Sequence, residues 1–178
     1  MQALQRITTE YDEHEDRLRL SGELSDGSSV LLWLTQRLLY RILPHLTQWL
    51  GQHDAGAAGN AVGLWQDTDW IQGFAQQAAQ AQLAPSPPVR TSASTASWRV
   101  DRAHIIETTT TTGTPTLCVV FQGPAQQEAR LVLAPQPLRQ WLGIVYAQTQ
   151  RGQWPMAAWP TWMHESQACG APPAAALH

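Results

Sequence analysis

The chain has 178 residues, of which 43% are hydrophobic, and eleven cationic side chains face fourteen carboxylates for a formal net charge of −3. This length allows one well-buried domain or two small halves with a shared core. All eleven cations are arginines, and the acidic balance argues against a protein that relies on phosphate neutralisation. Because there is no membrane-length apolar run and no secretory signal, we expect a cytoplasmic protein that does not bind membranes.

The first block, residues 1–52, predicts three antiparallel strands followed by a helix. Alternating residues at 7–11 and 18–20 and the turn signal Asp26-Gly27 predict the strands, the third of which covers 28–34. Thr35 is the expected N-cap of a helix that reaches about residue 50. Gly51 is the expected stop, and Pro44 predicts a kink or a break.

The middle of the chain, residues 53–97, is predicted to hold a helical insert and a linker. A helix capped by Asp67 or Thr68 and ending near Leu83 would carry one apolar stripe. The stripe consists of Trp70, Ile71, Phe74, Ala75 and Ala78. The Pro-, Ser- and Thr-rich residues that follow have no core-forming side chains and predict a linker.

The second block, residues 98–164, repeats the plan of the first, and residues 165–178 are expected to form a tail. A half-exposed threonine-rich strand, a buried strand over 117–121 and a returning strand over 128–133 precede a helix that reaches about residue 150. When Leu32 is set on Leu131, the apolar positions of the two helices coincide. Gly22 then falls on Gly123 if the first hairpin loop has two extra residues.

The predicted fold class is therefore α+β, with a duplicated β-β-β-α unit, antiparallel sheet or sheets, and helices packed on one side. We expect Leu34 to superpose on Leu133 and Leu43 on Leu142, with all four buried. Such a plan resembles the whirly and PUR-type single-stranded nucleic-acid binders in topology. The resemblance covers no motif, so it assigns a role to no residue of this chain.

Motifs for catalysis or metal binding are weak. There is no Gly-rich phosphate loop and no Gly-x-Ser-x-Gly elbow. His104 and Glu107 are three apart in a predicted strand, which places them on opposite faces. The acidic turn 12–16 lacks the glycine and spacing of a calcium loop. Cys118 lies among apolar residues, which predicts an inert core thiol.

The tail offers no recognised zinc spacing, although three of its residues are potential ligands: His164, Cys169 and His178. We therefore expect no catalytic, cofactor or metal site.

The Trp- and Pro-rich end of the second block admits two interpretations. Its large side chains either close the core over the second helix or form a hot spot at an interface, where tryptophan is enriched. The candidate interaction residues are Trp154, Met156, Trp159, Trp162 and Met163.

By elimination, the sequence favours a non-catalytic protein-binding, assembly or accessory protein that docks on a protein partner or self-associates as a homodimer. One alternative is a single-stranded nucleic-acid binder that uses Trp stacking and Arg contacts. Another is an enzyme with an unrecognised site.

Overall fold

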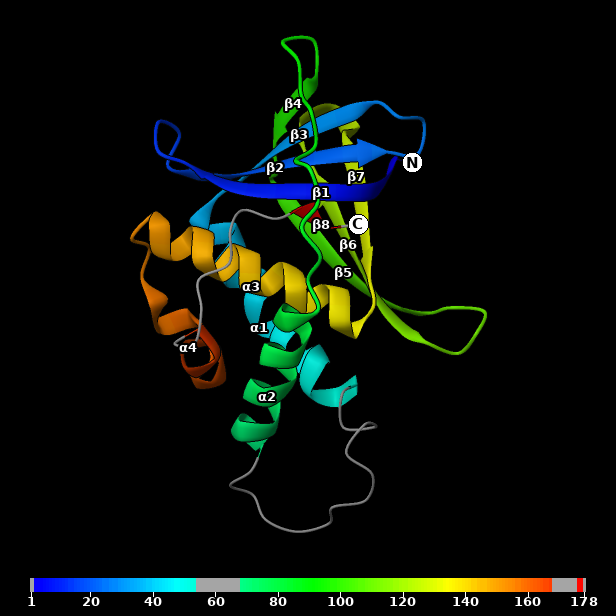
Figure 1. Ribbon diagram of the computed structural model, residues 1–178. Coiled ribbons are helices and arrows are strands. Elements are labelled where there is room, and N and C mark those ends of the chain that lie inside the picture. Colours follow the sequence, from blue (N-terminus) through cyan, green and yellow to red (C-terminus); the bar gives the residue numbers. More distant parts are fainter. Residues whose placement is uncertain (1, 54–67, 168–175, 178) are drawn as a thin grey trace.

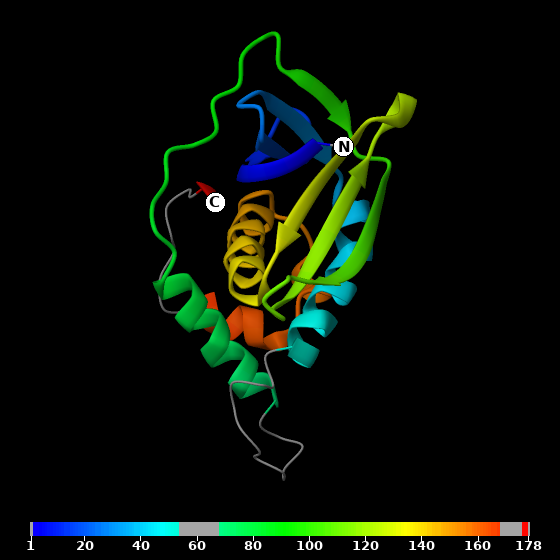
Figure 2. The ribbon, with the colours of Figure 1, turned by 90° about the vertical axis from the view of Figure 1, so that its right-hand side faces the viewer.

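The computed structural model describes residues 2–53, 68–167 and 176–177 and is α+β, as predicted (Figure 1). Its strands gather in one half of the molecule and its helices in the other (Figures 1 and 2). The strands are β1 (Gln2–Asp12), β2 (Arg17–Leu24), β3 (Ser29–Leu34), β4 (Ala96–Arg99), β5 (Arg102–Thr109), β6 (Pro115–Gln122), β7 (Glu128–Leu133) and β8 (Ala176–Leu177). The helices are α1 (Gln36–His53), α2 (Thr68–Ala81), α3 (Pro135–Arg151) and α4 (Thr161–Gln167), with short 3-10 turns at Pro124–Gln126 and Met156–Ala158.

The hairpin of β2 and β3 forms where the turn signal predicts it. Gly27 adopts a φ of 79°, which favours glycine, and its N–H donates to the Leu24 carbonyl at 3.0 Å. Thr35 then caps α1, because its Oγ1 accepts a hydrogen bond from the Leu38 N–H at 3.3 Å. The predicted cap is thus confirmed.

Helix α1 runs past both of its predicted interruptions. Gly51 lies inside the helix, which ends at His53, and Pro44 does not break it. Proline removes one helical hydrogen bond, but α1 buries an apolar stripe against the core on either side of Pro44. We conclude that this tertiary packing sustains the helix across both residues. The buried residues are Leu39, Ile42, Leu43, Leu46, Trp49 and Leu50.

The strands form one curled mixed sheet in the order β4-β3-β2-β1-β7-β6-β5, and β8 pairs with β1. The expectation of purely antiparallel sheets is wrong, because β1 pairs with β7 and β3 pairs with β4 in parallel. The first strand of each block therefore joins the last strand of the other. Strands β4 and β5 are separated only by Val100 and Asp101, whose N–H groups donate to Trp33 on β3 and Gln122 on β6.

The two blocks have the same hairpin register. Leu20 faces Leu32 across β2 and β3, and Val119 faces Leu131 across β6 and β7, so both pairs are twelve residues apart. The four residues expected to match are all buried, with Leu34, Leu43 and Leu142 at 0% exposure and Leu133 at 3%. Superposition of the two halves remains a prediction.

The predicted match of Gly22 with Gly123 is wrong for the hairpin register. Gly22 faces Val30, and the position that corresponds to Gly22 in the second hairpin is Phe121. The two glycines nevertheless pack alike. A Cβ on Gly22 would collide with Leu4, and one on Gly123 would collide with the ring of Trp98. Each glycine therefore gives room to a large side chain of the first strand of its own block.

The core extends through both blocks. One cluster of buried side chains includes residues from β1, β2, β3, β4, β6 and β7 and from α1, α3 and α4, and the half-buried Ala103 and Ile105 of β5 pack against it. Trp141 on α3 is fully buried, and its Nε1 donates to Thr9 Oγ1 on β1 at 3.1 Å. Among the described residues, no helix has the length and apolar character needed to cross a membrane.

The acidic turn between β1 and β2 ties the end of α3 to the sheet. Asp16 has a φ of 47°, and its Oδ1 accepts hydrogen bonds from Trp154 Nε1 at 2.8 Å and from the Tyr11 hydroxyl at 2.9 Å. Both hydrogen bonds lower the pKa of the Asp16 carboxyl below its ordinary value, and the bond from Trp154 contributes more than the bond from Tyr11.

We expect part of the stability of the protein to depend on the ionisation of Asp16. Since the folded pKa is depressed, this contribution is complete above the unfolded pKa of about 3.9 and is lost as pH falls through the folded value. Urea denaturation of wild type and Asp16→Asn between neutral and acidic pH measures it. Glu13→Gln, in the same turn, is the control. Equal pH dependence in wild type and Asp16→Asn would contradict the assignment.

Candidate functional site

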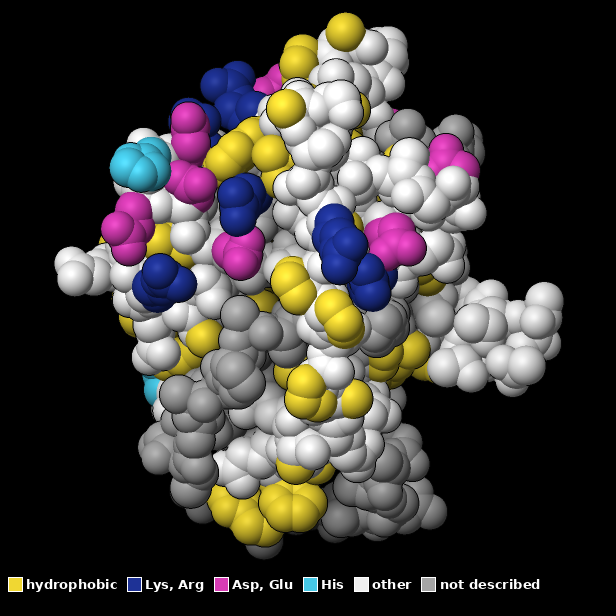
Figure 3. Space-filling model, turned by 45° about the horizontal axis from the view of Figure 1, so that its top comes forward, with side chains coloured by type: hydrophobic (Ala, Val, Ile, Leu, Met, Phe, Trp, Pro, Cys, Tyr) yellow, Lys and Arg dark blue, Asp and Glu magenta, His cyan; other side chains and the backbone are white. Residues whose placement is uncertain are grey.

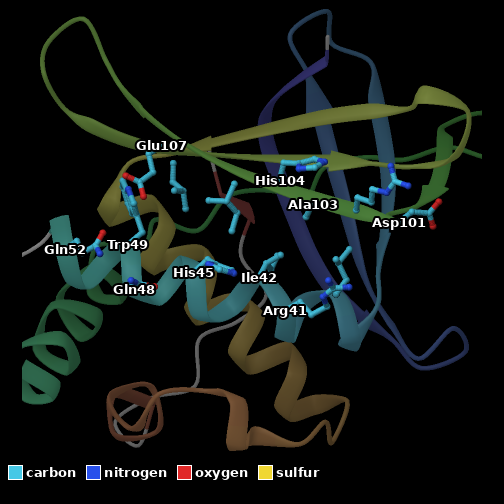
Figure 4. A pocket seen from close by; sticks show the side chains of 14 residues that line it. Arg41, Ile42, His45, Gln48, Trp49, Gln52, Asp101, Ala103, His104 and Glu107 are labelled. Carbon is cyan, nitrogen blue, oxygen red and sulfur yellow. The ribbon is translucent and has the colours of Figure 1, made fainter.

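A groove of about 620 Å³ lies between α1 and β5 (Figure 4). Helix α1 contributes one wall and β5 the other, although these elements are some fifty residues apart in the chain. The groove is lined by Leu38, Arg41, Ile42, His45, Gln48, Trp49, Gln52, Asp101, Arg102, Ala103, His104, Ile105, Glu107 and Leu117.

The helical period of α1 explains the mixed character of its wall. Arg41, His45 and Gln48 follow one another at spacings of three to four residues and are exposed. Ile42 and Trp49 lie on the neighbouring stripe and are buried. The groove therefore has an apolar base and a polar rim.

The other wall is a strand with an open edge. Strand β5 is the last in the sheet path, and among the described residues it pairs only with β6. The Thr110 N–H donates to the Thr114 carbonyl, which continues the β5–β6 register by one residue pair. Hydrogen-bonded and non-hydrogen-bonded pairs alternate along an antiparallel ladder. Even-numbered residues of β5 consequently direct their N–H and C=O toward β6. Those of Ala103, Ile105 and Glu107 face the open edge.

The charges of the groove are separated along its length. Glu107 lies at one end with Trp49 and Gln52, and Arg41 and Asp101 lie at the other (Figure 4). Asp101 is held by Arg99, whose Nη2 is 3.0 Å from its Oδ1. Within the described residues, Arg41 and Arg102 have no carboxylate in ion-pair contact.

The corresponding edge of β1 is covered. Ile7 occupies on β1 the position of Ala103 on β5, since Ile7 faces Gly22 and Ala103 faces Phe121. Strand β8 pairs antiparallel with β1 at Ile7 and Thr8. Farther along, the Tyr11 N–H donates to Gln148 Oε1 on α3 at 2.9 Å. The edge of β1 beside α3 is therefore occupied by this chain, whereas no residue that the structure describes pairs with the edge of β5 beside α1.

The predicted apolar stripe of α2 faces outward. Trp70 is 71% exposed and Phe74 65% exposed, and their rings stack at 6.1 Å. The polar side of the helix faces inward because Arg139 of α3 lies beneath it. Arg139 is 2% exposed, and its guanidinium donates to the carbonyl and the side-chain oxygen of Gln72. Gln76 donates back to the Arg139 carbonyl at 2.8 Å.

The candidate interaction residues of the Trp- and Pro-rich end pack against the core. Their exposure is 5% for Trp154, 3% for Trp159, 5% for Trp162 and 0% for Met163, and Met156 is half-buried. This burial agrees with the core-closing interpretation. An additional role in an interface remains a prediction.

The other candidate residues that the structure describes are divided between the groove and positions outside its lining. His104 and Glu107 both line the groove, and the His104 ring contacts Gln122 Oε1 at 3.0 Å. Burial raises the pKa of the Cys118 thiol, as predicted. His164 contacts the Tyr146 hydroxyl at 2.8 Å. Nowhere in residues 2–53, 68–167 and 176–177 do three potential metal ligands come together.

Cys169 and His178 lie outside the described residues. The expected tail is partly structured, because α4 continues through residues 165–167 and β8 follows.

Comparison with known proteins gives no relative for this chain. It matches no protein-family model, no curated protein and no solved structure.

The burial of the tryptophans leads to a stability prediction. Trp159→Ala and Trp162→Ala should each lower the free energy of unfolding by about 3 to 5 kcal/mol, because each removes a large buried side chain. Urea denaturation measures the loss, and light scattering on the same samples measures association. Trp70→Ala is the control, since Trp70 is exposed. Unchanged stability with impaired association would show that the two rings act at an interface instead.

Proposed function

We propose that this protein is a non-catalytic protein-binding module that accepts an extended segment of a protein partner as an additional strand on β5. The observation that carries the proposal is the open edge of β5, which faces a groove closed on its other side by α1. A cytoplasmic location and self-association remain predictions.

Strand addition suits this groove for two reasons. The outward N–H and C=O groups of Ala103, Ile105 and Glu107 can form main-chain hydrogen bonds with any extended peptide. Alternate side chains of such a peptide would meet the apolar base at Ile42 and Trp49. Main-chain bonds thus supply affinity, and the base and the rim supply selectivity.

The pairing of β8 with β1 supports the proposal. Two residues of an extended segment already add to the edge of β1 beside α3. The edge of β5 beside α1 occupies the same place in the other block, as the equivalent registers of the two hairpins indicate.

Nucleic-acid binding has less support. Several arginines are engaged with carboxylates, with N···O distances of 2.8 Å for Arg6, 2.7 Å for Arg17, 2.6 Å for Arg19 and 2.9 Å for Arg130. Arginine and acidic side chains also alternate over the face shown in Figure 3, with no continuous basic stripe.

Selection from a displayed library of random linear peptides tests the proposal. We expect selected peptides to bind in the groove, and Ala103→Pro to weaken binding at least about tenfold, because proline removes an outward N–H. Thr109→Pro is the matched control. Like Ala103, Thr109 is an odd-numbered residue of β5 whose N–H faces away from β6, but it lies outside the groove lining. Fluorescence anisotropy gives the affinities.

N-methylated peptides provide a version of this test that leaves the protein unchanged. Methylation of successive peptide amides should weaken binding at every second position, because only alternate amides of an added strand face β5. Failure to select any peptide, or equal sensitivity at all positions, would contradict strand addition.

The nucleic-acid alternative is tested separately. We expect only weak binding of single-stranded oligonucleotides at physiological salt, because the net charge is −3. Submicromolar affinity with a steep salt dependence in an anisotropy titration would favour the alternative over the proposed function.

A further inference from the structure

We infer that the groove takes the carboxyl-terminal end of its partner, an inference that rests on the proposed function. The bound segment runs antiparallel to β5, and its terminal carboxylate lies between Arg41 and Arg102. Three features of the groove carry this inference: the direction of the strand on the equivalent edge, the place where the open edge stops, and the charge at that place.

The direction follows from β8. On the edge of β1 the added strand is antiparallel, with Leu177 facing Ile7 and Ala176 facing Thr8. The same arrangement on β5 would place successive peptide residues beside His104 and then Ala103. The carboxyl-terminal end of the peptide would consequently lie toward Asp101 and Arg102, at the beginning of β5.

The open edge ends abruptly at that point. Strand β4 directly precedes β5, and its neighbour is β3, which pairs with it through Trp33 and Arg99. The Val100 N–H continues this pairing with the Trp33 carbonyl at 2.9 Å. An added strand therefore meets the end of β3 after Arg102. A peptide that terminates there can remain in the plane of the sheet, whereas a continuing chain must bend out of it.

The charge at this end suits a carboxylate. Arg41 and Arg102 both line the groove and are exposed, and among the described residues neither has an ion-pair partner. The nearby carboxylate of Asp101 is engaged by Arg99 through both Nε, at 3.2 Å, and Nη2, at 3.0 Å. Two guanidinium groups are thus available for charge-assisted hydrogen bonds to a terminal carboxylate.

The other end of the groove fits the opposite end of the peptide. Glu107 lies there beside Gln52 and Trp49 (Figure 4). The groove therefore offers negative charge where the amino-terminal part of the segment lies and positive charge where the segment ends. A parallel peptide would bring its carboxylate to Glu107, where like charges repel.

Selected peptides synthesised as free acids and as carboxamides test the inference. In wild type we expect the carboxamide to bind at least about tenfold more weakly, because a charge-assisted hydrogen bond is lost. In the double variant Arg41→Gln/Arg102→Gln the free acid should weaken by a similar factor, and the two peptide forms should bind alike. Arg37→Gln, on the exposed side of α1 and outside the groove lining, should behave as wild type.

A nitroxide attached to either end of the peptide reports its direction. A label at the amino terminus should broaden NMR signals around Gln52 and Glu107, and a label at the penultimate position should broaden those around Asp101 and Arg102. The reverse pattern would overturn the antiparallel assignment.

The outcomes separate this inference from the proposed function. One outcome is that carboxamides, or segments with further residues on both sides, bind as tightly as free acids and remain sensitive to Ala103→Pro. In that case strand addition stands and carboxylate capture is wrong. If no peptide responds to Ala103→Pro or to alternate N-methylation, the proposed function itself fails.

Discussion

The need of every strand for hydrogen-bonded neighbours shapes this molecule. In the first block, the beginning of β1 pairs with β7 and the rest of β1 pairs with β2. In the second block, β4 pairs with β3, and β5, which continues β4 after Val100 and Asp101, pairs with β6. This change of partner closes the sheet path through Val100 and Asp101. It also leaves the later part of each first strand with an unpaired edge, and unpaired main-chain groups must be satisfied by other protein groups, solvent or a ligand.

The two blocks differ in what lies against these edges of β1 and β5. On β1, the chain supplies β8 and the side chain of Gln148. On β5, the neighbouring element is α1, which turns polar side chains toward the edge and leaves a groove. Exposed edges promote unspecific association between sheets, and the charged rim at Arg41 and Glu107 restricts what can approach. The same features that protect the edge would select a partner.

Local signals in the sequence predicted the two strand hairpins and the helices that follow them. The Asp26-Gly27 turn and the Thr35 cap depend on neighbouring residues, so a single sequence reveals them. The parallel pairings join Gln2 to Ala129 and Val30 to Ala96, which are 127 and 66 residues apart, and leave no local trace. Strand β8 has only two residues, too few for a periodic pattern.

The candidate site depends on contacts between residues that are far apart in the chain, and the sequence pattern does not reveal such contacts. The sequence predicted the apolar stripe of α2 but not its direction, which depends on buried Arg139 and its polar partners Gln72 and Gln76. The groove combines Arg41 with Arg102, which come from different blocks. The sequence showed only that the threonine-rich strand is poorly buried, which agrees with the exposed face of β5.

Residue-resolved amide hydrogen exchange on the free protein distinguishes an open edge of β5 from a paired one. If the edge is open, exchange should be fast at Ala103, Ile105 and Glu107 and slow at His104 and Ile106, whose N–H groups face β6. Uniformly slow exchange along β5 would show that the edge is already paired and that no added strand can bind there.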